Sequence, residues 1–375
     1  MLSQSGNKRN PTLTQAELNG VMASHERYVL GRGGLRAQLG HKVLDGLNLA
    51  NRNLMEADFA GASLVGANLF GSNLERASFY CADLRDCNLR VANLTRADLR
   101  GASFSGAQLG RANLDNADLR SATMMLVGPD GVNIVGDGKA ATRTGTSVGV
   151  DFSNCSLKYA SFGNAKLDGA NFTGALLQGA NFKGAKLTNA SFRGAVLTGV
   201  ALKDLAVPPE ALEGCVKDVS AEAVAKFDAL KAKIDGHQAW LSSGGANGNP
   251  ANIDGEDLRP AQNLFVGRSL AGLSARGVVA IGIDFSGSSL QAIKFDGADL
   301  RDCNFTQADL RGASLRSAKL AHANFDKADL GSLHMANGAD LHPDFAGSDV
   351  VQEQLRNSHL VDALSALGVT VSSTA

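Results

Sequence analysis

The chain has 375 residues, with 36 lysines and arginines against 37 aspartates and glutamates, and a formal net charge of −1. This balance argues against a strong nucleic-acid binder and against a protein that imitates a polyanion, because both need uncompensated charge of one sign. The N-terminus is polar and no run of eighteen apolar residues occurs. We therefore expect neither a signal peptide nor a membrane span, and the cytoplasm is the default location.

The N-terminal segment, residues 1–43, contains one predicted helix. Thr14 and Glu17 have the spacing of a capping box, and apolar side chains then recur at helical spacing until glycines at 31, 33 and 34. We expect this helix to cap the structure that follows it.

A five-residue repeat organises residues 44–207. Every fifth residue from Leu49 to Leu119, and again from Phe152 to Leu197, is leucine or phenylalanine, usually with alanine two places before it. Alternate side chains of a strand point the same way, so both of these face inward and the residue between them faces outward. Between 169 and 199, a Gly or Asn stands two places after each inward Leu or Phe, and it supplies the positive φ of a tight corner. The repeat predicts an all-β solenoid of short strands.

Several units carry a resemblance to a known family. Ala-Asn-Phe-Thr-Gly at 170–174, Ala-Asn-Phe-Lys-Gly at 180–184 and Ala-Asp-Leu-Arg-Gly at 97–101 and 308–312 resemble the A(D/N)LXX unit of pentapeptide-repeat proteins. The resemblance implies a right-handed quadrilateral β-helix with four units per coil, so that residues twenty apart share a face. The phenylalanines between 152 and 192 would then lie on two opposite inner walls.

The repeat is interrupted once inside the first solenoid. Residues 127–150 have no five-residue phase and are rich in turn-forming glycine. We expect them to form a loop that leaves the coil. Residues 208–252 then form an inter-unit helical segment, with one helix starting after Ser220 and a flexible stretch at 244–250.

A second solenoid is predicted over residues 253–345. Its regular array starts at Phe285 and continues through Leu330 to Met335. The remaining residues, 346–375, are read as a C-terminal helix and tail, because apolar residues from Val350 to Leu367 suit an amphipathic helix. That helix would close the coil or, alternatively, form the contact of a homodimer.

The two solenoids share a helical entrance. His25 and Tyr28 in the first helix match His237 and Trp240 in the second at the same spacing. An open coil end exposes unpaired backbone, so each helix is expected to cap its own coil. The four residues are interpreted as structural caps in which each histidine fixes its helix by a hydrogen bond. A shared binding feature is the alternative.

Charged side chains give the best functional indication. On a twenty-residue coil Tyr80, Arg100 and Arg120 fall in one column, and Lys166 and Lys186 share another face. These five residues form a possible interaction surface, with an ordinary solvated face as the alternative. The outward aspartates are followed two places later by arginine, so the first array presents a mixed ladder.

The sequence favours a non-catalytic scaffold that presents its solenoid faces and the loop 127–150 to a protein partner. No nucleophile, base and oxyanion set is recognisable, the five cysteines lack zinc or disulfide spacing, and no cofactor or metal is expected. The alternative, which resemblance to the quinolone-resistance proteins implies, is a DNA-mimic modulator of a type II topoisomerase such as gyrase. An enzyme would need a catalytic cluster between the two units.

Overall fold

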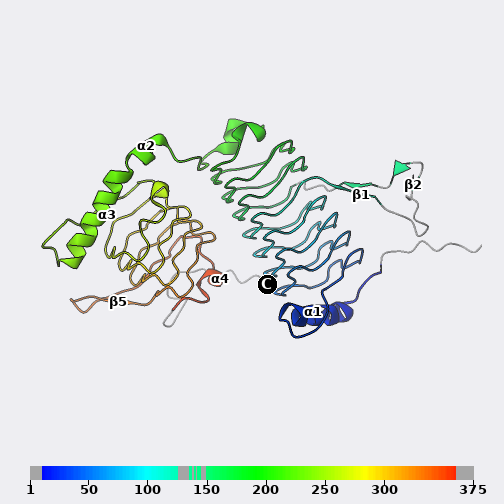
Figure 1. Ribbon diagram of the computed structural model, residues 1–375, viewed down its shortest axis with the longest axis horizontal. Coiled ribbons are helices and arrows are strands. Elements are labelled where there is room, and N and C mark those ends of the chain that lie inside the picture. Colours follow the sequence, from blue (N-terminus) through cyan, green and yellow to red (C-terminus); the bar gives the residue numbers. More distant parts are fainter. Residues whose placement is uncertain (1–10, 126–134, 137–138, 141, 145–148, 360–375) are drawn as a thin grey trace, which may run out of the picture. The chain divides into compact units, whose positions relative to one another are not determined.

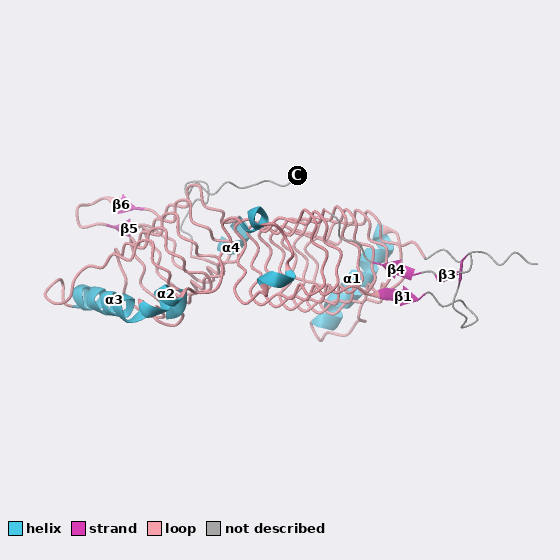
Figure 2. Cartoon of the chain, turned by 90° about the horizontal axis from the view of Figure 1, so that it is seen from above, coloured by secondary structure: helices cyan, strands magenta, loops and turns pink. Residues whose placement is uncertain are grey.

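The computed structural model describes residues 11–125, 135–136, 139–140, 142–144 and 149–359. The chain divides into two compact units, Met1–Asp218 and Val219–Ala375. Each unit contains a solenoid of short extended segments, visible as a row of parallel turns (Figures 1 and 2). Within the described ranges no helix is both long enough and apolar enough to cross a membrane.

The coil of the first unit is set by parallel bridges between residues twenty apart. Ser78 pairs with Asp98, and Asp98 with Asp118. Leu99 N donates to Asp118 O at 2.8 Å, so the backbone groups of one coil are satisfied by the next. Four five-residue units therefore make one coil. The inward alanine and Leu/Phe positions are almost fully buried, and each large side chain contributes roughly 1.5–3 kcal/mol of apolar burial.

Phenylalanine fills two inner walls of the coil, as the twenty-residue period predicts. Phe162 and Phe182 stack at 4.6 Å between ring centroids, and Phe172 stacks on Phe192 at 4.8 Å. Rings from the two stacks meet edge to face, as Phe172 and Phe182 do at 5.7 Å and 89°. This geometry is favourable for aromatic quadrupoles, and it confirms the predicted placement.

The corners use the left-handed backbone conformation. Gly169 and Asn189 have φ of 69° and 59°, which confirms the prediction made for these positions. The same conformation also occurs at residues poorly suited to it, including Val91 with φ of 61°. The coil register imposes this conformation on whichever residue stands at the corner.

The chain leaves the coil once in this unit and returns to the same register. β1 (Thr123–Met125) pairs antiparallel with β4 (Thr142–Thr144), and β2 (Val135–Gly136) pairs with β3 (Lys139–Ala140). Most of the predicted loop 127–150 lies outside the described residues. On either side of it, Asp118 bridges to Ser161 and Gln108 to Asp151, so the two arrays form one continuous coil.

The first coil starts beneath α1 (Gln15–Val29). Thr14 and Glu17 form the predicted capping box, and the helix buries Leu18, Met22 and His25. At the other end the unit closes with two 3₁₀ turns, η1 (Leu202–Asp204) and η2 (Pro209–Leu212).

The second unit begins with two helices rather than the one expected after Ser220. α2 (Ala221–Ala225) is capped by the Ser220 hydroxyl and ends at Lys226, where α3 (Phe227–Ser242) starts. α3 buries Leu230, Ile234 and His237, the same spacing as in α1.

The second coil starts at Asn252, one residue before the predicted start of the second solenoid at 253, whereas the expected start of its regular array at Phe285 is wrong. Asn252 bridges to Ser274, and this first coil is longer by two residues because it includes the 3₁₀ turn η3 (Arg259–Ala261). In the units around Leu273 and Ala275 the large residue precedes the small one, and both are buried. This inversion hides the repeat in the sequence.

Two expectations for the C-terminal part are also corrected. Met335 is not an inward residue: it is exposed in the hairpin of β5 (Leu333–His334) and β6 (Asp340–Leu341), and the coil resumes where Asp344 bridges to Ser314. The helix expected over 350–367 is only α4 (Gln352–Leu355), because His359 already bridges to Asp329 as the coil continues. Residues 360–367 lie outside the described ones.

Candidate interaction surface of the first unit

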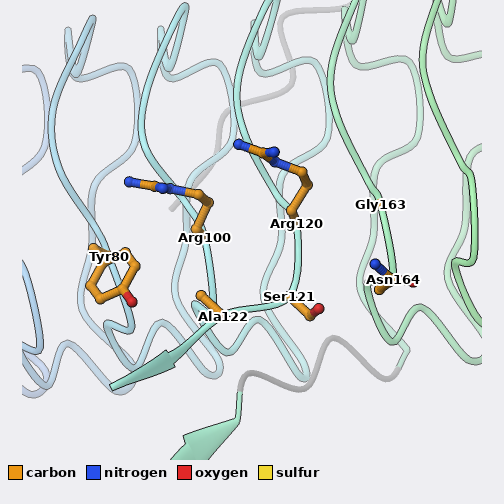
Figure 3. Close-up of a pocket in the computed structure, with 7 residues that line it drawn as sticks. All are labelled: Tyr80, Arg100, Arg120, Ser121, Ala122, Gly163 and Asn164. Atoms are coloured by element: carbon orange, nitrogen blue, oxygen red, sulfur yellow. The ribbon is translucent and has the colours of Figure 1, made fainter. Parts of the chain in front are cut away.

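Tyr80, Arg100 and Arg120 lie on successive coils at one corner of the first unit (Figure 3). Each comes two residues after a bridged position, so the backbone register places them in a column. The Arg100 guanidinium carbon lies 5.3 Å from the centre of the Tyr80 ring, within the range of a cation–π contact. The structure therefore brings together the first three predicted surface residues.

Both arginines of this corner are paired with the aspartate two residues earlier. Arg100 donates to Asp98 at 2.8 and 2.7 Å, and Arg120 to Asp118 at 2.9 and 2.6 Å. Partial burial raises the pKa of Asp118, but the hydrogen bonds and charge of Arg120 outweigh it and the net pKa is lowered. The hydrogen bond and charge of Asp98 raise the pKa of Arg100. The corner therefore presents guanidinium planes that are largely neutralised.

The same aspartate–arginine arrangement recurs elsewhere. Asp83–Arg85 and Asp309–Arg311 are exposed or half-buried pairs with an Nη2–Oδ2 distance of 2.7 Å. Arg301 and Asp299 of the second unit form a buried pair, with side chains only 2% and 9% exposed. The recurrence shows that this pairing follows from the repeat itself.

A hollow of about 290 Å³ lies beside Arg100 and Arg120. It is open because Gly163 occupies the next place in the column, where the earlier coils carry Tyr80 and the two arginines. Ser121 and Ala122, the last residues before β1, form its other side (Figure 3). The hollow therefore adjoins the place where the chain leaves the coil.

Lys166 and Lys186 lie on the neighbouring wall and not in this column. They are bridged to one another on adjacent coils, and both side chains are exposed. Lys183, which the predicted surface does not include, is exposed. It belongs to the column of Arg120, because Asn181 bridges to Ser161 and Ser161 to Asp118. Gly163 and Lys183 can be assigned to the column of Arg120 only when the strand pairing across the loop 127–150 is known. The five-residue pattern does not reveal that pairing.

The four predicted cap residues lie at the two coil entrances. Ala37 N donates to His25 Nδ1 at 3.0 Å, and Ala251 N donates to His237 Nδ1 at 3.1 Å. The His237 Nε2 donates to Ala271 O at 3.1 Å, whereas the buried His25 Nε2 has no hydrogen bond of normal geometry among the described residues.

The neighbouring aromatic rings complete the similarity of the two entrances. Tyr28 and Trp240 each lie with a ring centroid 5.8 Å from the adjacent imidazole. Burial lowers the pKa of both histidines. The imidazole at each entrance is therefore a neutral acceptor for a backbone amide.

In the part of the chain that the structure describes, no three His, Cys, Asp or Glu side chains gather as metal ligands would. The histidine and aspartate side chains that lie close together in sequence at 334–344 have other partners or contact one another. Asp340 contacts His334, and Asp344 pairs with Arg316 at 2.6 Å. His342 shares a hydrogen bond of 2.7 Å with Ser332.

Models of known protein families match the repeats of this chain. A family model described as pentapeptide repeats matches residues 53–90, 92–127, 148–174, 269–307 and 293–331, and a second model of the same description matches 162–204. Together they cover more than half of the chain. No curated protein is significantly similar in sequence.

Three solved structures illustrate the similarity. HetL, a pentapeptide repeat protein involved in heterocyst differentiation regulation in the cyanobacterium Nostoc, is 17% identical over 82% of this chain and 81% of its own, with a TM-score of 0.23. The plasmid-mediated fluoroquinolone resistance protein QnrB1 is 17% identical over 50% and 90%, with a TM-score of 0.26. A pentapeptide repeat protein of the Arabidopsis thaliana thylakoid lumen is 29% identical over 31% and 68%, with a TM-score of 0.21.

Proposed function

This chain belongs to the pentapeptide repeat family, and we propose that it is a non-catalytic scaffold that binds a protein partner through the outer face of its first unit. We further propose that its two solenoids are right-handed quadrilateral β-helices. His25, Tyr28, His237 and Trp240 are assigned the structural role of capping their coils.

The observation that carries the scaffold proposal is the ordered column of Tyr80, Arg100 and Arg120. Tyrosine and arginine are enriched among the residues that dominate protein–protein binding energies. Here their side chains are held before any partner arrives, by the Asp98 and Asp118 pairs and by the Tyr80–Arg100 contact. Preorganisation lowers the entropy that is lost on association. The adjoining hollow adds a recess for a partner side chain.

The topoisomerase alternative is less well supported. A DNA mimic needs carboxylates without neighbouring cations, so that the face resembles a phosphate backbone. In this column the aspartates are bound bidentately by arginine. The alternative would gain from a partner that is recovered only when the loop 127–150 is present.

A cytoplasmic location and a homodimer formed through the C-terminal residues stay predictions.

The test is a pull-down with the full chain, followed by calorimetry with the recovered protein. Arg100→Gln/Arg120→Gln removes two guanidinium groups from the proposed surface. Arg85→Gln/Arg311→Gln removes two from equivalent aspartate pairs elsewhere. We expect a partner to be retained by the wild type and the second variant and lost from the first. Equal retention by all three would contradict the proposal.

A further inference from the structure

Three exposed lysines of the first unit that form no ion pair among the described residues are named here the lysine patch: Lys166, Lys183 and Lys186. Lys166 and Lys186 are bridged on adjacent coils, with Leu167 N donating to Lys186 O at 2.8 Å. Adjacent strands lie about 4.8 Å apart, so the two ammonium stems start from neighbouring positions on one wall. Lys183 precedes Lys186 on the same coil, at the corner above Gly163.

The patch differs from several other cations of this unit, which are paired. Arg76, Lys158 and Arg193 each pair with a glutamate or aspartate, as Arg100 and Arg120 do. Within the described ranges none of the three patch lysines forms an ion pair, although Asp168 stands at the next corner.

Like charges directly opposite on neighbouring strands destabilise a sheet. Lys166 and Lys186 are such a pair of like charges on adjacent coils. Asparagine or serine, which stands at many other outward positions, would remove the repulsion between them. A bound anion would turn the repulsion into attraction.

We propose that the lysine patch binds an acidic segment of the partner protein, an inference that rests on the scaffold function proposed above. In an extended segment, side chains on one side recur about every 6.6–6.8 Å. Flexible lysine stems rooted one coil apart can follow carboxylates at that spacing. The segment would continue past Lys183 to the hollow beside Arg120, where Gly163 leaves room for a side chain.

A protein segment fits this surface better than a nucleic acid does. A protein that binds DNA strongly makes roughly 6–10 phosphate contacts, and its interface is strongly positive throughout. Here the patch has three unpaired cations, and the adjacent Arg100 and Arg120 are already bound to aspartates. The whole chain carries a net charge of −1.

The test measures binding of a fluorescein-labelled peptide of alternating glutamate and glycine to the full chain by fluorescence anisotropy. Lys166→Glu/Lys186→Glu reverses two patch charges. Lys203→Glu/Lys294→Glu makes the same change in net charge at two exposed lysines outside the patch. We expect the patch variant to bind about tenfold more weakly, the control variant to match the wild type, and added salt to weaken binding.

Two kinds of result in the binding assay would overturn the inference. One is absence of peptide binding, or an equal loss in both variants, which would show that the patch is not the site. The other is tighter binding of a single-stranded DNA oligomer of the same charge, lost in the patch variant, which would make nucleic acid the ligand. If a pull-down partner is lost from Arg100→Gln/Arg120→Gln but still binds Lys166→Glu/Lys186→Glu, this inference fails while the scaffold function stands.

Discussion

The side chain of Arg120 lies across Gly163, with its Cγ and Cδ 3.4 and 3.5 Å from the position that a Cβ on that glycine would take. The backbone of Gly163 does not require glycine, because the same place in the column carries Tyr80, Arg100, Arg120 and Lys183. Glycine at this position therefore matters for the surface and not for the fold.

Gly163→Tyr should fill the hollow and displace Arg120 without unfolding the coil. We expect partner binding to weaken by about tenfold or more, with the free energy of unfolding changed by less than about 0.5 kcal/mol. Thr173→Tyr, at the matching place of another column, is the control and should leave binding unchanged. Calorimetry and urea unfolding measure the two effects. A large loss of stability in Gly163→Tyr would show that the glycine is structural.

Phe182 tests the packing of the interior. Its ring stacks on Phe162 and meets Phe172 and Phe192 edge to face, and it is 1% exposed. Phe182→Ala should reduce the free energy of unfolding by about 3–5 kcal/mol. Phe182→Leu, which introduces the residue found on the other two walls, should cost about 1–2 kcal/mol because mainly the aromatic contacts are lost. Urea denaturation provides both values, and a cost below about 1 kcal/mol for alanine would be inconsistent with this core.

Val91 is an unfavourable residue for its backbone conformation. Its φ of 61° belongs to the left-handed region, which asparagine occupies at the equivalent corners 51, 116, 154 and 164. Val91→Asn should therefore stabilise the first unit by about 1 kcal/mol, seen as a higher midpoint of thermal unfolding. Thr95→Asn, outside the left-handed region, is the control and should change little. A lower midpoint for Val91→Asn would mean that the valine side chain contributes more by packing than its backbone costs.

The cap histidines predict a pH dependence of stability. Burial lowers the pKa of His25 and His237, and each Nδ1 must be unprotonated to accept its backbone N–H. Their contribution is therefore fully present above the unfolded pKa of about 6.5. It falls as the pH drops from there through the lowered folded pKa, because the unfolded state binds more protons.

Replacing both histidines with alanine should destabilise the protein more at pH 7.5 than at pH 5. The measurement is urea unfolding of the wild type and of this variant across that range. A difference in stability that is the same at every pH would exclude titration of the caps.

The sequence predicts best those features that depend only on local residue type and spacing. The inward phenylalanines, the left-handed corners at Gly169 and Asn189, and the capping box of Thr14 and Glu17 are local consequences of residue type and spacing, and each is found. The second solenoid is predicted from residue 253, but its regular array is not recognisable before Phe285. Leu273 and Ala275 exchange the usual sizes, so the search for Leu or Phe at every fifth residue fails there although both still fill the interior.

The candidate surface was only partly predictable for a related reason. Tyr80, Arg100 and Arg120 follow the period of twenty, so their column could be calculated from sequence. Gly163 and Lys183 belong to the same column only because the coil resumes in register after β4, which depends on tertiary pairing of Asp118 with Ser161. Within residues 350–359 the expected closing helix is reduced to α4, because the coil continues to His359 and backbone pairing prevails over a weak amphipathic pattern.

The most direct test of a partner-binding surface on the first unit is site-specific photo-crosslinking in cells of the source organism. A photoreactive phenylalanine analogue replaces Tyr80 in one variant and Tyr159, a 66% exposed tyrosine of another column, in a second. A partner-binding surface at this corner predicts a discrete crosslinked protein from the Tyr80 position that is absent from the Tyr159 position and is lost when Arg100→Gln/Arg120→Gln is added. Crosslinks that are equal at both positions, or that persist after loss of the arginines, would contradict a partner-binding surface at this corner.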